Sequence, residues 1–79
     1  MRVSGYMTKM DLSYFVDRTG MPRAEFAQMA NVHRNTLLGA SDRVMRPATA
    51  WRITRAYAQL LQIDEEDALD TLFYPHYLG

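Results

Sequence analysis

The sequence predicts an all-α fold, a compact five-helix domain. Apolar residues recur at helical spacing in five separate stretches of the chain. Turn-forming or helix-breaking residues separate these stretches, at Gly20, Pro22, Asn31, Gly39, Pro47 and Pro75. The length of 79 residues suits a single domain, and a chain of this size buries only about 60% of its unfolded surface, so a partner could complete the core. We expect one domain at 1–79, with helices at about 9–19, 23–30, 33–41, 49–62 and 65–73.

The first helix, at 9–19, is expected to begin after Thr8, whose hydroxyl can cap it. Asp11 lies in the first turn, where the helix dipole favours a negative charge. The buried stripe of this helix consists of Leu12, Phe15 and Val16. Gly20 then ends the helix, and Pro22 suits the start of the next one, because proline has a helical φ and no N–H is needed there.

Residues 23–30 and 33–41 read as two short helices joined by a tight turn. The first helix has one apolar face, formed by Phe26, Ala27 and Ala30. Asn31 follows it and tolerates the left-handed conformation that ends a helix. The second helix turns Leu37 and Ala40 inward, and its outer face carries His33, Arg34, Asn35, Leu38 and Gly39.

After a connecting loop at 41–48, the fourth helix at 49–62 is the longest, with apolar residues at Ala50, Ile53, Ala56, Tyr57, Leu60 and Leu61. Asp64 is expected to cap the fifth helix at 65–73, whose first turn is acidic as the helix dipole favours. The tail at 74–79 carries too much aromatic area to lie free in water. Either it folds back on the domain or it packs against a second subunit.

Charge is divided unevenly along the chain, although the net charge is zero. Residues 1–55 hold all nine Lys and Arg against four acids, a net charge of +5, whereas the last 24 residues hold five acids and no Lys or Arg. Such a division is expected when one end of a protein faces nucleic-acid phosphates and the other faces away. The alternative interpretation is a chance fluctuation together with one acidic helix start.

The segment that begins at Gly20 reads Gly-Met-Pro-Arg-Ala-Glu-Phe-Ala-Gln-Met-Ala-Asn-Val-His-Arg-Asn-Thr-Leu, and Arg46-Pro47 lies downstream. It resembles the phage-repressor family of helix-turn-helix DNA-binding proteins, the Cro or xenobiotic-response-element type, over about residues 12–73. The resemblance implies a lambda-repressor-like domain of five helices around one core. The chain departs from the family pattern at three positions: Arg23 replaces a frequent Gln, Asn31 replaces a turn Gly, and His33 replaces a capping Ser.

In this family the outer face of the third helix enters the major groove, and the resemblance carries this role over to Arg34, Asn35, Leu38 and Gly39. Arginine pairs with O6 and N7 of guanine, asparagine pairs with N6 and N7 of adenine, and leucine can contact a thymine methyl. Phosphate contacts, which fix register without reading sequence, are expected from Arg23, His33, Thr36, Arg43 and Arg46. The alternative is a solvated helix face with Leu38 packed against the loop and the loop arginines in solvent.

The resulting prediction is a sequence-specific, double-stranded DNA-binding transcriptional regulator that acts as a homodimer on a pseudo-palindromic operator. Two recognition helices would then lie about 34 Å apart, one turn of DNA. The expected dimer surface is formed by Leu69, Leu72, Phe73, Tyr74, Tyr77 and Leu78. One alternative is a protein-binding module that holds another regulator, and another is an antitoxin or excision factor with the same DNA chemistry.

Other classes of function find little support in the sequence. We expect no enzyme, because no set of residues converges on a reacting atom, and no cofactor, because a phosphate-cradling glycine loop is missing. Two histidines without cysteine make a metal site unconvincing. The N-terminus lacks the apolar core of a signal peptide, and no apolar stretch approaches the ~20 residues of a membrane span. We therefore expect a cytoplasmic protein without a membrane or small-molecule partner.

Overall fold

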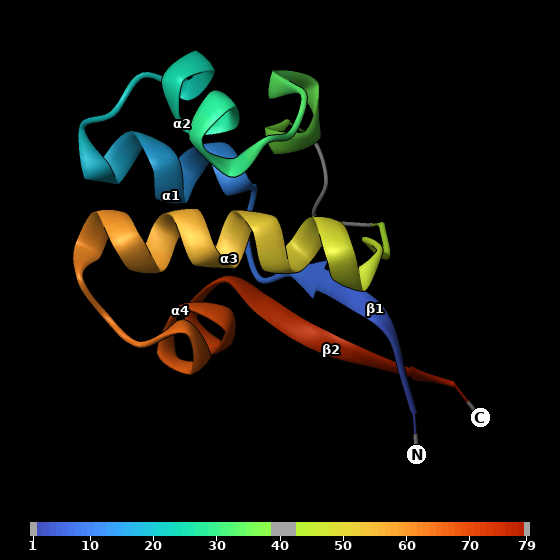
Figure 1. The fold of residues 1–79 in the computed structure, drawn as a ribbon. Helices are drawn as coiled ribbons and strands as arrows, with labels where there is room; N and C mark the ends of the chain where they lie inside the picture. Colours follow the sequence, from blue (N-terminus) through green and yellow to red (C-terminus); the bar gives the residue numbers. More distant parts are fainter. Residues whose placement is uncertain (1, 39–42, 79) are drawn as a thin grey trace.

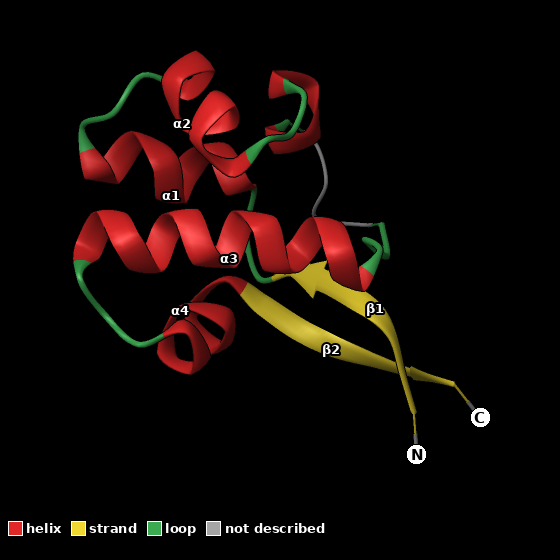
Figure 2. Ribbon diagram, viewed as in Figure 1, coloured by secondary structure: helices red, strands yellow, loops and turns green. Residues whose placement is uncertain are grey.

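The computed structural model of the chain describes residues 2–38 and 43–78. In chain order these residues form β1 (Arg2–Thr8), α1 (Leu12–Thr19), α2 (Arg23–Ala30), the 3-10 helix η1 (Arg34–Leu37), α3 (Pro47–Leu61), α4 (Glu65–Leu72) and β2 (Phe73–Leu78). The fold is mixed α/β, since β1 and β2 pair into an antiparallel sheet (Figure 2). The prediction of an all-α, five-helix lambda-repressor-like domain is therefore wrong.

The long helix α3 crosses the middle of the molecule, with α1 and α2 on one side and α4 on the other (Figure 1). Ala50, Ile53 and Ala56 are buried at helical spacing along α3, and the helix contacts α1 and α2 on one side and α4 on the other. Large side chains from every layer complete a single core, among them Leu12, Phe26, Leu37, Leu72 and Phe73. The apolar periodicity seen in the sequence thus identified most of the core correctly, although it did not identify the sheet.

The helix boundaries differ from expectation where a strand or a proline intervenes. α1 begins at Leu12 and not near residue 9, because Thr8 belongs to β1 and the N–H of Lys9 donates to the carbonyl of Leu72 at 2.9 Å. α2 covers 23–30 as expected, and Asn31 after it is left-handed with φ 58°. α3 begins at Pro47, because proline is accepted in the first turn of a helix.

The expected α-helix at 33–41 is replaced, over its described residues, by the single 3-10 turn η1. Leu38 already has an extended backbone, with φ −107° and ψ 136°, so the helix does not continue beyond Leu37. Asparagine and threonine in the middle of η1 have low helix propensity, and Leu37 is anchored in the core. Local preference and packing together therefore favour one tight turn. Gly39 and Ala40, which were expected in this helix, lie outside the described residues.

The tail folds back on the domain as β2 and pairs with β1 from Thr8 opposite Phe73 to Arg2 opposite Leu78. We call the two-stranded β1–β2 sheet the ribbon. Both ends of the chain lie together at the end of this ribbon that points away from the helices (Figure 1). The register shifts between Val3 and Gly5. Because this irregularity inserts one extra residue, Val3 and Tyr6 come to lie on the same face of the ribbon, towards α4.

A second contact joins the ribbon to the segment before α3. The N–H of Tyr6 donates to the carbonyl of Met45 at 2.8 Å, and the N–H of Met45 donates to the carbonyl of Tyr6 at 2.6 Å. The two backbones approach so closely here that a Cβ on Gly5 would lie 2.5 Å from the carbonyl oxygen of Met45. Gly5 therefore permits the contact that fixes the position of the 43–46 segment.

Candidate functional site

The turn η1 is held in place by its own capping residue. His33 precedes it with an extended backbone, and the Nδ1 atom of His33 accepts a hydrogen bond from the N–H of Asn35 at 3.1 Å. A neutral imidazole that accepts at Nδ1 carries its proton on Nε2. The carbonyl of His33 also accepts from the N–H of Thr36 at 2.8 Å. With Leu37 fully buried beneath it, η1 presents Arg34, Asn35 and Leu38 to solvent.

Two adjoining hollows flank this turn. One, which we call the Arg43 hollow, has a volume of about 340 Å³ and is lined by Asn35, Thr36, Leu38, Arg43, Val44 and Met45. The other, the Arg34 hollow, has a volume of about 250 Å³ and is lined by Arg23, Ala24, Arg34, Asn35 and Leu38. Asn35 and Leu38 belong to both hollows, so the two form one continuous surface around η1.

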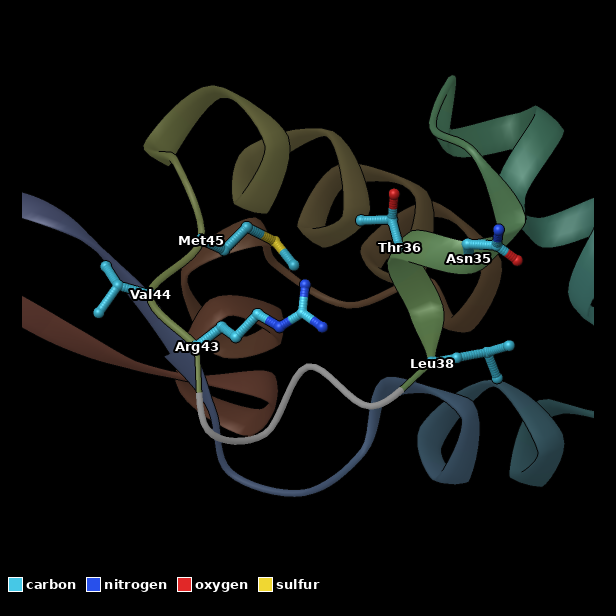
Figure 3. Close-up of a pocket in the computed structure, with 6 residues that line it drawn as sticks. All are labelled: Asn35, Thr36, Leu38, Arg43, Val44 and Met45. Carbon is cyan, nitrogen blue, oxygen red and sulfur yellow. The ribbon is translucent and has the colours of Figure 1, made fainter.

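The Arg43 side chain extends from its own segment towards η1, with its guanidinium in the space beside Thr36 and Met45 (Figure 3). Thr36 borders this space from η1 and offers a hydroxyl for hydrogen bonds, whereas the side chain of Asn35 points away from Arg43. No acidic side chain lines either hollow among the described residues. An anion bound here would meet positive charge and hydrogen-bond donors, although one described carboxylate, that of Asp17, is bound to Arg23 at 2.7 Å.

Arg23 already has a carboxylate partner, whereas no ion pair is seen for Arg34 or Arg43 among the described residues. Its Nη2 and Nε atoms donate to the two carboxylate oxygens of Asp17 at 2.7 and 3.0 Å. The hydrogen bonds from Arg23 lower the pKa of Asp17, and the same contact raises the pKa of Arg23. Since both side chains are about half exposed, this pair adds little to stability. It does reduce the net charge that Arg23 offers to an anion.

The acidic residues that follow residue 56 lie mainly on α4, across α3 from η1 (Figure 1). Glu65, Glu66, Asp67 and Asp70 are all exposed there. Two of them pair with cations, Glu65 with Arg55 at 3.6 Å and Asp70 with Lys9 at 4.0 Å. Exposed arginines therefore lie around η1, and the carboxylates of α4 lie on the far side of α3, where Lys9 and Arg55 pair with two of them.

The structure brings together six of the nine residues expected to contact DNA: Arg23, Arg34, Asn35, Thr36, Leu38 and Arg43 line the two hollows. His33 caps the turn between them, and Arg46 is exposed at the start of α3, next to Met45. Gly39 lies outside the described residues. The sequence did not indicate Ala24, Val44 or Met45, which also line the hollows. Val44 and Met45 form an apolar pair in the otherwise mostly polar loop at 41–48, and this pattern could have indicated that they pack against the site.

The residues expected at a dimer surface fall into two groups. Leu72 and Phe73 are buried in the core of their own chain, with 1% and 2% of their surface exposed. Leu69 and Tyr77 line a hollow beside α4, and Tyr74 is exposed. The backbone of Leu78 pairs with that of Arg2 at the end of the ribbon. Leu72 therefore cannot contact a second copy, because it is buried and lines no hollow, whereas Phe73 borders the hollow beside α4.

Comparison with protein-family models, with curated proteins and with solved structures found no match. Within residues 2–38 and 43–78, no group of three or more His, Cys, Asp or Glu could hold a metal ion. Nor is any helix of that part of the chain long and apolar enough to cross a membrane. Function must therefore be inferred from the geometry of the η1 surface.

Proposed function

We propose that this chain is a sequence-specific, double-stranded DNA-binding transcriptional regulator that contacts DNA through the surface around η1. The observation that carries the proposal is the pair of adjoining hollows, which combine arginines with Asn35 and contain no described carboxylate. Positive charge favours the phosphate backbone, because binding releases condensed counterions. The acidic face on α4 would point away from the DNA and would orient the approach.

Within this surface the residues divide by chemistry. Arg34 reads guanine and Asn35 reads adenine, because their side chains match the hydrogen-bonding edges of those bases in the major groove. Arg43 and Arg46 contact phosphates, and Arg23 adds a weaker contact because Asp17 already shares its guanidinium. Leu38 lies where it can meet a thymine methyl.

The shortness of η1 limits how much sequence one chain can read. Its four residues, at about 2 Å rise each, span about 8 Å, whereas base pairs are stacked about 3.4 Å apart. One chain therefore reads only two or three base pairs. A homodimer on a pseudo-palindromic operator doubles this number, with the two η1 turns about 34 Å apart.

The proposal is tested by selecting bound sites from random duplex DNA. We expect an enriched palindrome with half-sites of two or three fixed base pairs, their centres about one helical turn apart. Selection without any enriched sequence would contradict the sequence-specific part of the proposal. An Arg34→Ala variant serves as a control, because it should lose preference for guanine while its affinity for unselected DNA changes little.

One observation favours a second candidate, a protein-binding module that holds another regulator. Leu38 and Val44 are 46% and 47% exposed, and both line the Arg43 hollow. Exposed apolar side chains around a cation also suit an acidic, apolar partner protein. The two candidates differ in their response to salt, since binding to duplex DNA weakens steeply with salt and a largely apolar interface does not.

A further inference from the structure

A third hollow lies on the other side of the molecule, between α4 and the ribbon. This α4 hollow has a volume of about 330 Å³ and is lined by Val3, Tyr6, Glu66, Leu69, Asp70, Phe73, Pro75 and Tyr77. Its lining is apolar or aromatic apart from the carboxylates of Glu66 and Asp70, and no Lys or Arg lines it among the described residues, although Asp70 pairs with Lys9 at 4.0 Å. Tyr77 is 48% exposed, so a large aromatic surface remains open to solvent. The α4 hollow suits an apolar group that carries a positive charge.

The far end of the same ribbon offers such a group. Arg2 is the only Lys or Arg in the two strands, it is exposed, and it lies beside Val3 and opposite Leu78. The α4 hollow extends along the ribbon as far as Val3 and Tyr77, and Arg2 lies one residue beyond it. Each chain therefore carries a basic tip and an acidic, apolar hollow that match each other in charge.

Pairing of two ribbons edge to edge is disfavoured by the backbone of β2. The N–H and the carbonyl of Tyr6 are both hydrogen-bonded to Met45, on the side of β1 away from β2. Tyr6 and Pro75 therefore form a non-hydrogen-bonded pair, in which the backbone polar groups of Pro75 point to the outer edge of β2. Pro75 has no N–H, and the N–H of Phe73 donates to the carbonyl of Leu69. The outer edge of β2 therefore offers few donors to another strand. A second copy has to use the faces of the ribbon.

We propose that two copies associate about a two-fold axis, each placing its Arg2 tip against Glu66 in the α4 hollow of the other. A two-fold axis makes the contact reciprocal, so both hollows are filled by the same interaction. The inference rests on the homodimer of the proposed function and refines it by naming its surface. The α4 hollow is lined by α4 and the ribbon, and α4 lies across α3 from η1, so this contact leaves both arginine-lined hollows free for DNA.

Sedimentation equilibrium of the full chain and its charge-reversal variants tests the inference. We expect a monomer–dimer equilibrium for the wild-type chain. Arg2→Glu and Glu66→Lys should each weaken self-association by about fivefold to tenfold, and the double variant should recover to within about twofold of wild type. Tyr77→Ala should weaken it by about thirtyfold, as expected for an aromatic residue at the centre of an interface.

Matched controls separate this contact from a general effect of charge or folding. Arg52→Glu makes the same charge change as Arg2→Glu on the exposed face of α3, and Asp67→Lys makes the same change as Glu66→Lys in the same turn of α4. Both should leave self-association within about twofold of wild type. Circular dichroism and thermal unfolding of each variant show whether it is folded.

Three results would overturn the inference: a wild-type monomer at all concentrations, open-ended oligomers, or a double variant that is no better than either single one. Binding of each variant to random duplex DNA at low salt tests the proposed function separately. A chain that dimerises with charge-swap recovery but does not bind DNA would support the Arg2–Glu66 contact and contradict the DNA-binding function. A chain that binds DNA without charge-swap recovery would support the function and contradict the contact.

Discussion

Replacing Gly5 by alanine puts a methyl group where the ribbon meets the 43–46 segment. The new Cβ would lie 2.5 Å from the carbonyl oxygen of Met45 and 2.5 Å from Cγ1 of Val44. The Val44 side chain can rotate, but the Met45 carbonyl is backbone and accepts the hydrogen bond from Tyr6. The segment therefore has to move away from β1, which strains or breaks the pair of hydrogen bonds between Tyr6 and Met45.

Overpacking of this kind costs about 1 to 3 kcal/mol, and each weakened hydrogen bond adds about 1 kcal/mol. We expect Gly5→Ala to lower the free energy of unfolding by about 2 to 4 kcal/mol in a urea titration. At about 4 to 8 °C per kcal/mol, the melting temperature falls by at least about 8 °C. Because Arg43 and Arg46 are carried by the displaced segment, affinity for duplex DNA should fall as well.

Gly20→Ala is the matched control. Apart from its chain neighbours, no atom of the described residues lies within 4 Å of the Cβ that alanine would add, but Gly20 has φ +83°, so alanine there is strained by its backbone conformation alone. That strain costs about 1 kcal/mol and does not touch the 43–46 segment. A Gly5→Ala variant that unfolds within about 0.5 kcal/mol of wild type, the range of neutral surface substitutions, would refute the steric role of Gly5 in this contact.

Four other single substitutions have defined expected outcomes. Thr8→Val should stabilise the fold by about 1 kcal/mol in a urea titration, because the buried hydroxyl of Thr8 has no hydrogen-bond partner among residues 2–38 and 43–78. A loss of stability would show that the hydroxyl is satisfied. Asn35→Ala should lose about 1 to 3 kcal/mol of discrimination at one base pair, and an equal loss on random DNA would argue against base reading. Arg46→Ala should instead weaken binding to all sequences alike, as measured by fluorescence anisotropy. Arg23→Ala should raise the pKa of Asp17 back towards its ordinary value in an NMR titration, because the hydrogen bonds that lower it are lost. A lowered pKa stabilises the fold above the ordinary pKa, and this stabilisation is lost as pH falls through the lowered pKa. Arg23→Ala should therefore reduce stability slightly at neutral pH, and its difference from wild type should disappear at the acid end of the stability profile.

Periodicity predicted those parts of the fold that depend on local sequence. The apolar faces of α2 and α3 place Phe26 and Ile53 in the core as expected, and Gly20 and Asn31 end their helices with positive φ. In each case residues within one or two turns of one another decide the structure. The sequence was sufficient for these elements.

The ribbon was not predictable in the same way, because its two strands are separated by nearly the whole chain. β1 has a glycine at its centre, and β2 contains Pro75, which argues against a strand when read locally. Only the pairing itself shows that the backbone of Pro75 faces outward and costs no hydrogen bond within the ribbon. The long-range contact therefore overrides the local signals.

The candidate site was predicted in its side chains and not in its shape. Arg34 and Asn35 lie on the exposed face of their turn as expected, but that turn is a short 3-10 helix. The place of Met45 depends on its hydrogen bonds to Tyr6, which no local pattern reveals. Residue types thus indicated which side chains could bind DNA, whereas the position of Arg43 relative to η1 depends on the contact between Met45 and the ribbon.

DNA binding through the η1 surface should be visible in the salt dependence of duplex affinity. We would measure the Kd for random duplex DNA by fluorescence anisotropy from low to physiological salt, for wild type, for Arg43→Ala combined with Arg46→Ala, and for Arg52→Ala as the control. With two phosphate-binding arginines per chain and two chains, log Kd should rise with log salt with a slope of about 4 for wild type and Arg52→Ala, and most of that slope should vanish in the double variant. Binding that does not respond to salt, or a slope unchanged in the double variant, would contradict DNA binding through the η1 surface.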